Sequence, residues 1–261
     1  MSMFGGCGST TEMSSSWGNT QVTVDGNANE WGSGLTNLKD TKVFLGVRND
    51  QDFVYLCLTS ADRQFRRQVI GTGLTLWFES EDGQRVGDLY PIGMAGQGRQ
   101  PSFNPDETPG SDERERIAQQ ALQDLEILGP GKDDKNLFSI VQSPGISVKV
   151  GGSQESGAYE LKVPLRKSTE HPYAVEAAAG STLKISIATG KFDPGSRPGG
   201  TGEGRHGDGG GGRPHGGGMS GGGMHEGGGG NGGETPHGAR PEPLDVSVKG
   251  RLAGSAPVLK A

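Results

Sequence analysis

Flat aromatic side chains are the groups in this sequence whose chemistry points to a ligand. A pyranose ring presents a face of C–H groups that stacks on an aromatic ring, while neighbouring polar groups bind its hydroxyls. Trp77 stands between Leu76 and Phe78 in an alternating segment, so its side chain is expected to lie opposite theirs. The candidate ligand-binding residues are Trp77, Trp31 and Tyr90.

The arrangement of nucleophiles, acids and histidines indicates no catalytic site. His171 is the only histidine outside a glycine-rich segment, and it stands beside Pro172 without a serine or cysteine nucleophile motif. A catalytic triad or a zinc site therefore lacks its parts. Carboxylates near predicted strand ends are interpreted as solvated turn residues rather than as a glycosidase pair. They include Glu79, Glu81, Asp82, Asp133 and Asp134. The sequence predicts a protein that is not an enzyme.

Two groups of residues carry oxygen, nitrogen or sulfur atoms that metals prefer. Asp25, Asn27, Asn29 and Glu30 alternate like the ligands of a calcium loop, but the glycine and the distant glutamate of an EF-hand are missing. A turn capped by its own Asp and Asn side chains is therefore expected. The second group could hold copper or nickel, but its glycine spacing favours a flexible spacer. It consists of His206, His215, Met219, Met224, His225 and His237. Neither a metal site nor a cofactor is predicted.

Composition and charge limit the size of the domain and the class of partner. Of the 261 residues only 30% are apolar and 49 are glycine, which favours one modest domain. The formal net charge is −6, and lysine and arginine do not cluster. Because phosphate backbones are bound by clustered cations, nucleic acid is excluded as a partner.

Two low-complexity segments divide the chain. Residues 1–20 are rich in serine, threonine and glycine and are expected to form a disordered leader. Residues 193–240 are rich in glycine and are interpreted as a disordered insertion in a loop before the last strand. Such an insertion is tolerable because the entropy of loop closure grows slowly with length. The folded domain is expected to span 21–192 plus 241–261.

Alternating apolar segments bounded by Asp, Asn or Gly predict strands through the whole domain. Residues 53–58 are apolar on both faces, which is typical of a central strand. One helix is predicted over 111–128, where apolar residues repeat at three- and four-residue spacing until Gly129-Pro130. A helical turn is expected over 62–70. The predicted fold is an all-β, antiparallel, jelly-roll-like β-sandwich with one packed α-helix and a long disordered glycine-rich loop.

Several of these segments together resemble a known family. The blocks V-T-V-D-G-N-A-N-E-W, T-K-V-F-L-G-V-R-N-D and D-F-V-Y-L-C-L resemble the opening of carbohydrate-binding module family 9 and the related DOMON-like sandwiches. The strand Y-E-L-K-V-P-L at 159–165 is similar to one common in that superfamily. The resemblance implies a β-sandwich with Trp31 packed at its base. The two-tryptophan clamp of the sugar-binding family has no residue-by-residue counterpart here.

The segment before the domain bears on location. Phe4-Gly5-Gly6-Cys7 resembles the cleavage box of bacterial lipoproteins, in which the cysteine becomes lipidated. The resemblance implies an envelope protein, periplasmic or in the outer membrane, that touches the membrane only through a lipid at Cys7. Three functions follow as alternatives. The first is a binding module, with a glycan as the expected partner; the second is an assembly protein that docks another envelope protein; the third is a DOMON-like haem protein with Met94 as axial ligand.

Overall fold

The computed structural model describes residues 10–18, 22–93, 111–131, 133–152, 157–190 and 242–254. The chain separates into a unit of residues 1–192 with 241–261, and a unit of residues 193–240. The second unit lies outside the described residues, so the predicted disorder of the glycine-rich segment stays a prediction. All described residues belong to the first unit.

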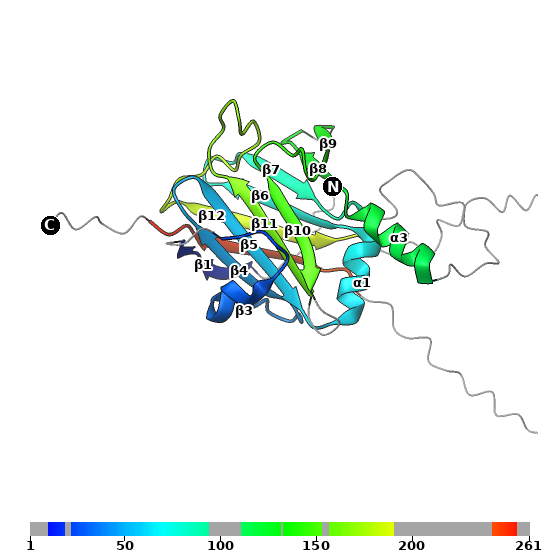
Figure 1. Ribbon diagram of the computed structural model, residues 1–261. Helices are drawn as coiled ribbons and strands as arrows, with labels where there is room; N and C mark the ends of the chain where they lie inside the picture. The colour runs from blue at the N-terminus through cyan, green and yellow to red at the C-terminus, as the bar shows by residue number, and fades with distance from the viewer. Residues whose placement is uncertain are drawn as a thin grey trace, which may run out of the picture. The chain divides into compact units, whose positions relative to one another are not determined.

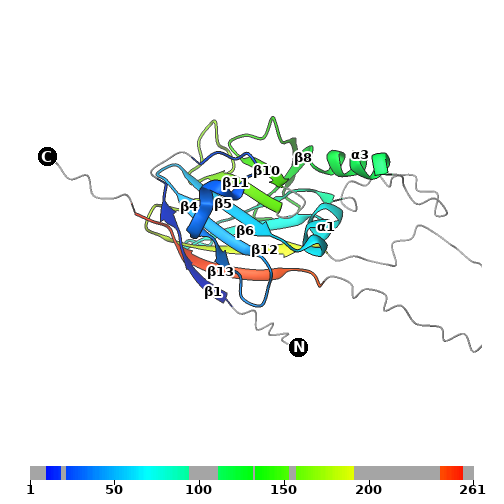
Figure 2. The ribbon, with the colours of Figure 1, turned by 60° about the horizontal axis from the view of Figure 1, so that its bottom comes forward.

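Two sheets face each other, as Figures 1 and 2 show, and the predicted β-sandwich is confirmed. Within the described residues the larger sheet has seven strands in the order β1-β13-β12-β6-β7-β8-β9. They are β1 (Thr10–Ser14), β13 (Asp245–Arg251), β12 (Thr182–Thr189), β6 (Leu74–Ser80), β7 (Arg85–Leu89), β8 (Asp124–Leu128) and β9 (Lys135–Ser139).

The smaller sheet has the order β10-β11-β5-β4-β2, and β3 pairs with β4 at its side. Its strands are β10 (Ser147–Gly152), β11 (Gly157–Pro164), β5 (Phe53–Ser60), β4 (Phe44–Asn49), β2 (Ser16–Trp17) and β3 (Thr36–Asn37). The strand β5 lies inside the sheet between β11 and β4, as the apolar character of both its faces predicted.

The leader and the strand directions differ from the sequence prediction. Residues 10–17 are not all disordered, because β1 pairs in parallel with β13 and β2 pairs in parallel with β4. Both sheets are therefore mixed rather than purely antiparallel. Threonine and serine side chains give these segments a polar composition, but the ladder hydrogen bonds come from the backbone and need no apolar pattern. Residues 1–9 lie outside the described part of the chain.

The helices also differ from the prediction. The described helices are the 3-10 helix η1 (Ala28–Gly34) and the α-helices α1 (Arg63–Thr72) and α3 (Ser111–Ala121). The predicted helix over 111–128 is wrong in its second half, since 124–128 form β8. There Leu125 and Ile127 are fully buried between partly exposed acids, which is the two-residue period of a strand. Pairing with β7 and β9 then satisfies the backbone of this segment.

The core between the sheets has the predicted orientation at β6. Leu74, Leu76 and Phe78 are buried, while Trp77 on the opposite face is partly exposed. Among these apolar side chains lies one polar pair that joins the sheets. The Tyr159 hydroxyl of β11 donates a hydrogen bond of 2.7 Å to Oδ2 of Asp88 on β7. The other carboxyl oxygen, Oδ1, has no hydrogen-bond partner among the described residues. Burial raises the pKa of Asp88 to about 7.

Candidate ligand-binding face

The first predicted aromatic residue, Trp31, is buried on the outside of the smaller sheet. Only 1% of its surface is exposed, and its ring packs so closely on Gly46 that an added Cβ would come within 2.7 Å of Cε3. The Arg48 guanidinium lies 4.9 Å from the ring centroid. A covered ring offers no stacking surface to a sugar. The structure therefore corrects the prediction that Trp31 binds ligand and agrees with the packed position that the family resemblance implies.

Glu160 is the residue that holds this region together, and sequence reasoning did not single it out. It is fully buried on β11, where its Oε1 accepts a hydrogen bond of 2.7 Å from the Trp31 indole N–H. Its Oε2 accepts from the backbone N–H groups of Asp25 and Gly26 at 3.0 and 2.8 Å. Burial raises the pKa of Glu160, although these hydrogen bonds favour the carboxylate. The available signal was an acidic residue between the apolar residues Tyr159 and Leu161 of a predicted strand.

The expected Asp and Asn turn is confirmed beside this carboxylate. The Asp25 side chain accepts from the backbone N–H of Asn27, and the Asn27 side chain accepts from that of Asn29, at 2.8 and 3.1 Å. The Glu30 side chain accepts from the backbone N–H of Thr23 at 3.0 Å. These oxygens hold the turn in place. The motif that resembled a calcium loop therefore serves to position Trp31.

The predicted ligand role of Tyr90 is also corrected. Tyr90 is 1% exposed, and its hydroxyl donates to the backbone carbonyl of Leu122 at 3.1 Å. Its ring lies 6.2 Å from that of Tyr159 inside the core. Burial raises the pKa of Tyr90 to about 12. Both faces of this ring belong to the packing between the sheets and the segment that precedes β8.

Trp77 is the predicted aromatic residue that the structure places at the surface. Its strand alternates buried and partly exposed residues, and Trp77 lies on the outer face of the seven-stranded sheet. In the register it stands between Ser186 of β12 and Gly87 of β7. A Cβ at Gly87 would come within 2.8 Å of the indole atoms Cδ2 and Cε3. The absence of a side chain at Gly87 therefore lets the ring extend sideways over the neighbouring strand.

Polar groups of several kinds surround this ring. The Arg85 guanidinium carbon lies 4.5 Å from the Trp77 ring centroid. Glu79, two residues along the same strand, lies 3.8 Å from Arg85 and 3.5 Å from Lys184 in two ion pairs. All three charged side chains are between 37% and 46% exposed. We call this surface the Trp77 face; it comprises Trp77, Glu79, Arg85, Lys184, Ser186 and Ser247.

Hydroxyl groups complete the Trp77 face on the side of β12. The hydroxyls of Ser186 and Ser247 lie 2.9 Å apart and hydrogen-bond to each other. Each hydroxyl oxygen keeps further capacity to accept or donate. The face therefore combines an aromatic ring with a cation, a carboxylate and hydroxyls on one sheet surface. This combination can stack against an apolar ring face and can bind hydroxyl groups around its rim.

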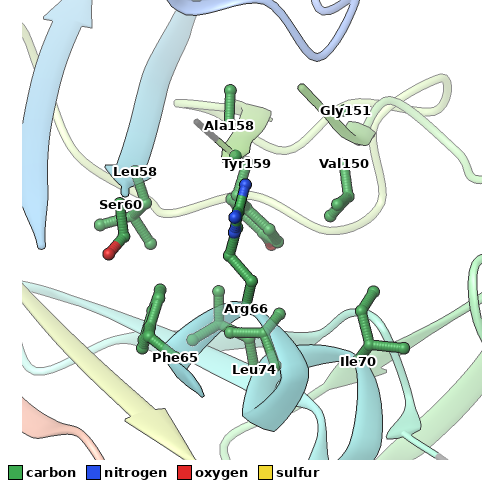
Figure 3. A pocket seen from close by; sticks show the side chains of 12 residues that line it. Leu58, Ser60, Phe65, Arg66, Ile70, Leu74, Val150, Gly151, Ala158 and Tyr159 are labelled. Carbon is green, nitrogen blue, oxygen red and sulfur yellow. The ribbon is translucent and has the colours of Figure 1, made fainter. Parts of the chain in front are cut away.

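A separate apolar pocket lies between α1 and the ends of β5, β10 and β11. Its volume is about 190 Å³, and Figure 3 shows the Arg66 side chain rising from α1 across it toward Ala158. Leu58, Phe65 and Val150 are among the side chains that surround it. A cavity of roughly 150 Å³ with apolar walls admits a molecule of the size of benzene. The pocket is therefore too small and too apolar for a sugar chain.

The remaining predicted residues are dispersed. His171 packs edge-on against Phe53, with ring centroids 5.5 Å apart. Asp134 caps a turn by accepting from the backbone N–H of Gly131 at 2.9 Å, as expected of a turn carboxylate. Cys7, Met94 and the histidines and methionines of 193–240 lie outside the described residues, so their predicted roles stay predictions.

Neither a metal-binding cluster nor a membrane-spanning helix occurs in the described part of the chain. There, His, Cys, Asp and Glu side chains form no group of three or more that could hold a metal ion. Of the helices described, none is long and apolar enough to cross a membrane.

Comparison with known proteins gives likeness of fold alone. No protein-family model matches the sequence, and no curated protein matches it. A family 9 carbohydrate-binding module from Caldicellulosiruptor kristjanssonii has been solved with glucose and with cellotriose. The glucose complex shares 9% identity over 70% of this chain and 80% of that chain, with a TM-score of 0.32. The cellotriose complex shares 9% identity over 70% and 78%, with a TM-score of 0.36.

A third solved structure, of a Bacteroides uniformis protein, shares 14% identity over 69% of this chain and 84% of that chain, with a TM-score of 0.37. With identities of 9–14% and TM-scores of 0.32–0.37, the likeness to these three structures is weak. At these scores it assigns no ligand and no site residue.

Proposed function

We propose that this protein is a non-enzymatic binding module whose Trp77 face binds a glycan. The observation that carries the proposal is the partly exposed Trp77 indole, which extends over Gly87 on an open sheet surface among charged and hydroxyl groups. Aromatic rings with a polar surround suit pyranose rings, which are apolar on their faces and polar at their edges. The apolar pocket and the two buried aromatic residues offer no such surface.

Binding has to rearrange one contact on this face. The Arg85 guanidinium, which lies over the Trp77 ring, is displaced by a sugar that stacks there. A cation–π contact at an exposed site contributes only about 0.5–1 kcal/mol, so the displacement costs little. The displaced guanidinium and the Glu79 carboxylate then become a donor and an acceptor for sugar hydroxyls. Ser186 and Ser247 provide hydroxyls on the other side of the ring.

The test is a glycan array with the full chain, followed by calorimetry on any glycan that binds. Trp77→Ala should weaken binding by at least about tenfold, because tryptophan is a frequent hot spot in interfaces. Phe44→Ala is the matched control, since Phe44 is a 43% exposed aromatic residue on the other sheet. Thermal unfolding of both variants establishes that they are folded. Equal glycan affinity of the Trp77→Ala variant and the wild type would exclude the Trp77 face as the site.

A further inference from the structure

A polar cleft at one end of the sandwich is separate from the Trp77 face in its chemistry. Its volume is about 590 Å³, within the range of roughly 300–1,000 Å³ typical of small-molecule sites. One wall is the turn between β6 and β7, and the other comes from the segment between β11 and β12. The polar residues that line it are Ser80, Glu81, Asp82, Gln84, Arg166, Lys167, Glu176 and Ser181.

An unpartnered buried hydroxyl lies in the lining of this cleft. Ser80 is only 7% exposed, and its Oγ has no hydrogen-bond partner among the described residues. It belongs to the inward-facing set of β6, so it reaches the cleft from the side of the core. A buried polar group without a partner costs about 1–3 kcal/mol, and each such group calls for an explanation. A polar ligand in the cleft would supply the partner.

The opposite wall holds a strained backbone. Glu176 has φ of 57°, a left-handed conformation that is uncommon for residues other than glycine. Its Oε1 accepts a hydrogen bond of 2.8 Å from the backbone N–H of Lys167. This bond ties the two parts of the wall together and fixes the position of Lys167. Strain of this kind is concentrated at ligand sites, where the surrounding structure maintains it.

Charges of opposite sign stand on the two walls without neutralising each other. Asp82 belongs to the β6–β7 turn, and Arg166 and Lys167 belong to the other wall. Within the described residues none of these three side chains makes an ion pair. Glu81 lies beside Asp82, and its carboxylate accepts from the backbone N–H of Thr182 at 2.7 Å. The turn wall therefore presents carboxylates, and the facing wall presents the cations Arg166 and Lys167 beside the Glu176 carboxylate, one oxygen of which already accepts from the Lys167 backbone N–H.

We propose that this cleft binds a small zwitterionic ligand, an amino acid or a dipeptide with free ends. Its carboxylate would pair with Arg166 and Lys167, and its ammonium group would pair with Asp82. A zwitterion carries its two charges at opposite ends, and the cleft carries unpaired charges of opposite sign on its two walls. Such electrostatic complementarity favours one class of ligand over others. A neutral sugar matches the cleft less well, because no aromatic side chain lines it and stacking is absent. The lining of this cleft shares no residue with the Trp77 face.

The test is calorimetric titration of the full chain with alanyl-alanine. The matched probe is the same dipeptide with an acetylated amino end and an amidated carboxyl end, which has the same backbone and neither charge. The free dipeptide should bind, and the capped one should bind at least about tenfold more weakly, because charge-assisted hydrogen bonds are the strong ones. Equal binding of the two probes, or no binding of the free dipeptide, would overturn the proposal.

Variants locate the site. Asp82→Asn, and Arg166→Gln together with Lys167→Gln, should each reduce affinity for the free dipeptide by about tenfold. Lys39→Gln with Asp40→Asn is the control, because it removes one exposed charge of each sign elsewhere on the surface. Unchanged affinity in the cleft variants would refute the assignment. So would loss of glycan binding in Asp82→Asn, since the cleft would then belong to the glycan site. Failure of the Trp77 proposal leaves this result unaffected.

Discussion

Asp88 should make the stability of this protein fall as the pH rises through the neutral range. Its pKa in the folded protein is about 7 because the carboxyl group is buried between the sheets. An aspartate in the unfolded chain titrates near 3.9. Between these two values the unfolded chain has released the proton and the folded protein still holds it. Unfolding then releases a proton, so a rise in pH favours the unfolded state.

The size of the effect follows from the same values. A difference of one in pKa is worth about 1.36 kcal/mol, so a difference of about three corresponds to roughly 4 kcal/mol. Asp88 should therefore not reduce the free energy of unfolding below about pH 4. Between about pH 4 and pH 7 the free energy of unfolding should fall, and above pH 7 it should stay lower by the full amount of about 4 kcal/mol. Against a typical total stability of about 5–15 kcal/mol this loss is large.

The perturbation is Asp88→Asn, which keeps the shape of the side chain and removes the titration. The Tyr159 hydroxyl can still donate to the amide oxygen, whereas the amide NH₂ takes the place of the unpartnered Oδ1. Burying that group costs about 1–3 kcal/mol at every pH. The variant should thus be less stable than the wild type at pH 4 and more stable at pH 8. Urea unfolding from pH 4 to pH 8 measures the difference.

Two further variants make the test specific. Asp245→Asn removes an exposed carboxylate and should leave the slope against pH as in the wild type. Tyr159→Phe removes the hydrogen bond that lowers the pKa of Asp88, so this pKa should rise. The free energy of unfolding should then continue to fall to a higher pH than in the wild type. If the wild type and Asp88→Asn show parallel stability curves from pH 4 to pH 8, the reasoning about burial is refuted.

Two predictions concern the region around Trp31. Glu160→Gln should lower the free energy of unfolding, measured by urea titration, by about 2–3 kcal/mol. The reason is that an amide NH₂ group would then face backbone donors such as the Gly26 N–H. A loss well below about 1 kcal/mol would contradict this account. Gly46→Ala should lower it by about 1–3 kcal/mol, because the new methyl group meets the Trp31 ring at 2.7 Å. Gly34→Ala is the control, since nothing lies within 4 Å of its Cβ position, and equal losses in both would exclude the steric explanation.

Local patterns were sufficient for much of the fold. The alternation through β6 placed Trp77 opposite Leu76 and Phe78, and the structure has this arrangement. The double-sided apolar run of β5 predicted a central strand, which it is. These inferences succeed because the side chains of a strand alternate between its faces, so burial on one face leaves a period of two in the sequence.

The errors arose where local patterns were ambiguous. The apolar residues of 121–128 fit a helix as well as a strand, and pairing with β7 and β9 decided the outcome. The polar strands β1 and β2 carry no apolar period, because they add to existing sheets through their backbones. Trp31 and Tyr90 were predicted to bind ligand because of their residue type, but residues distant in the sequence cover both side chains in the folded protein.

The sequence by itself determined that β5 and β6 are strands, which face of β6 carries Trp77, and that the Asp25–Asn29 segment is a turn. Each of these depends on residues that are adjacent along the chain. Only the tertiary structure decided that Glu160 binds that turn from 134 residues away, that Asp88 meets Tyr159 inside the core, and that Asp82 and Arg166 line the same cleft. Contacts of this kind depend on how the two sheets pack, and a single sequence has no local pattern that records the packing.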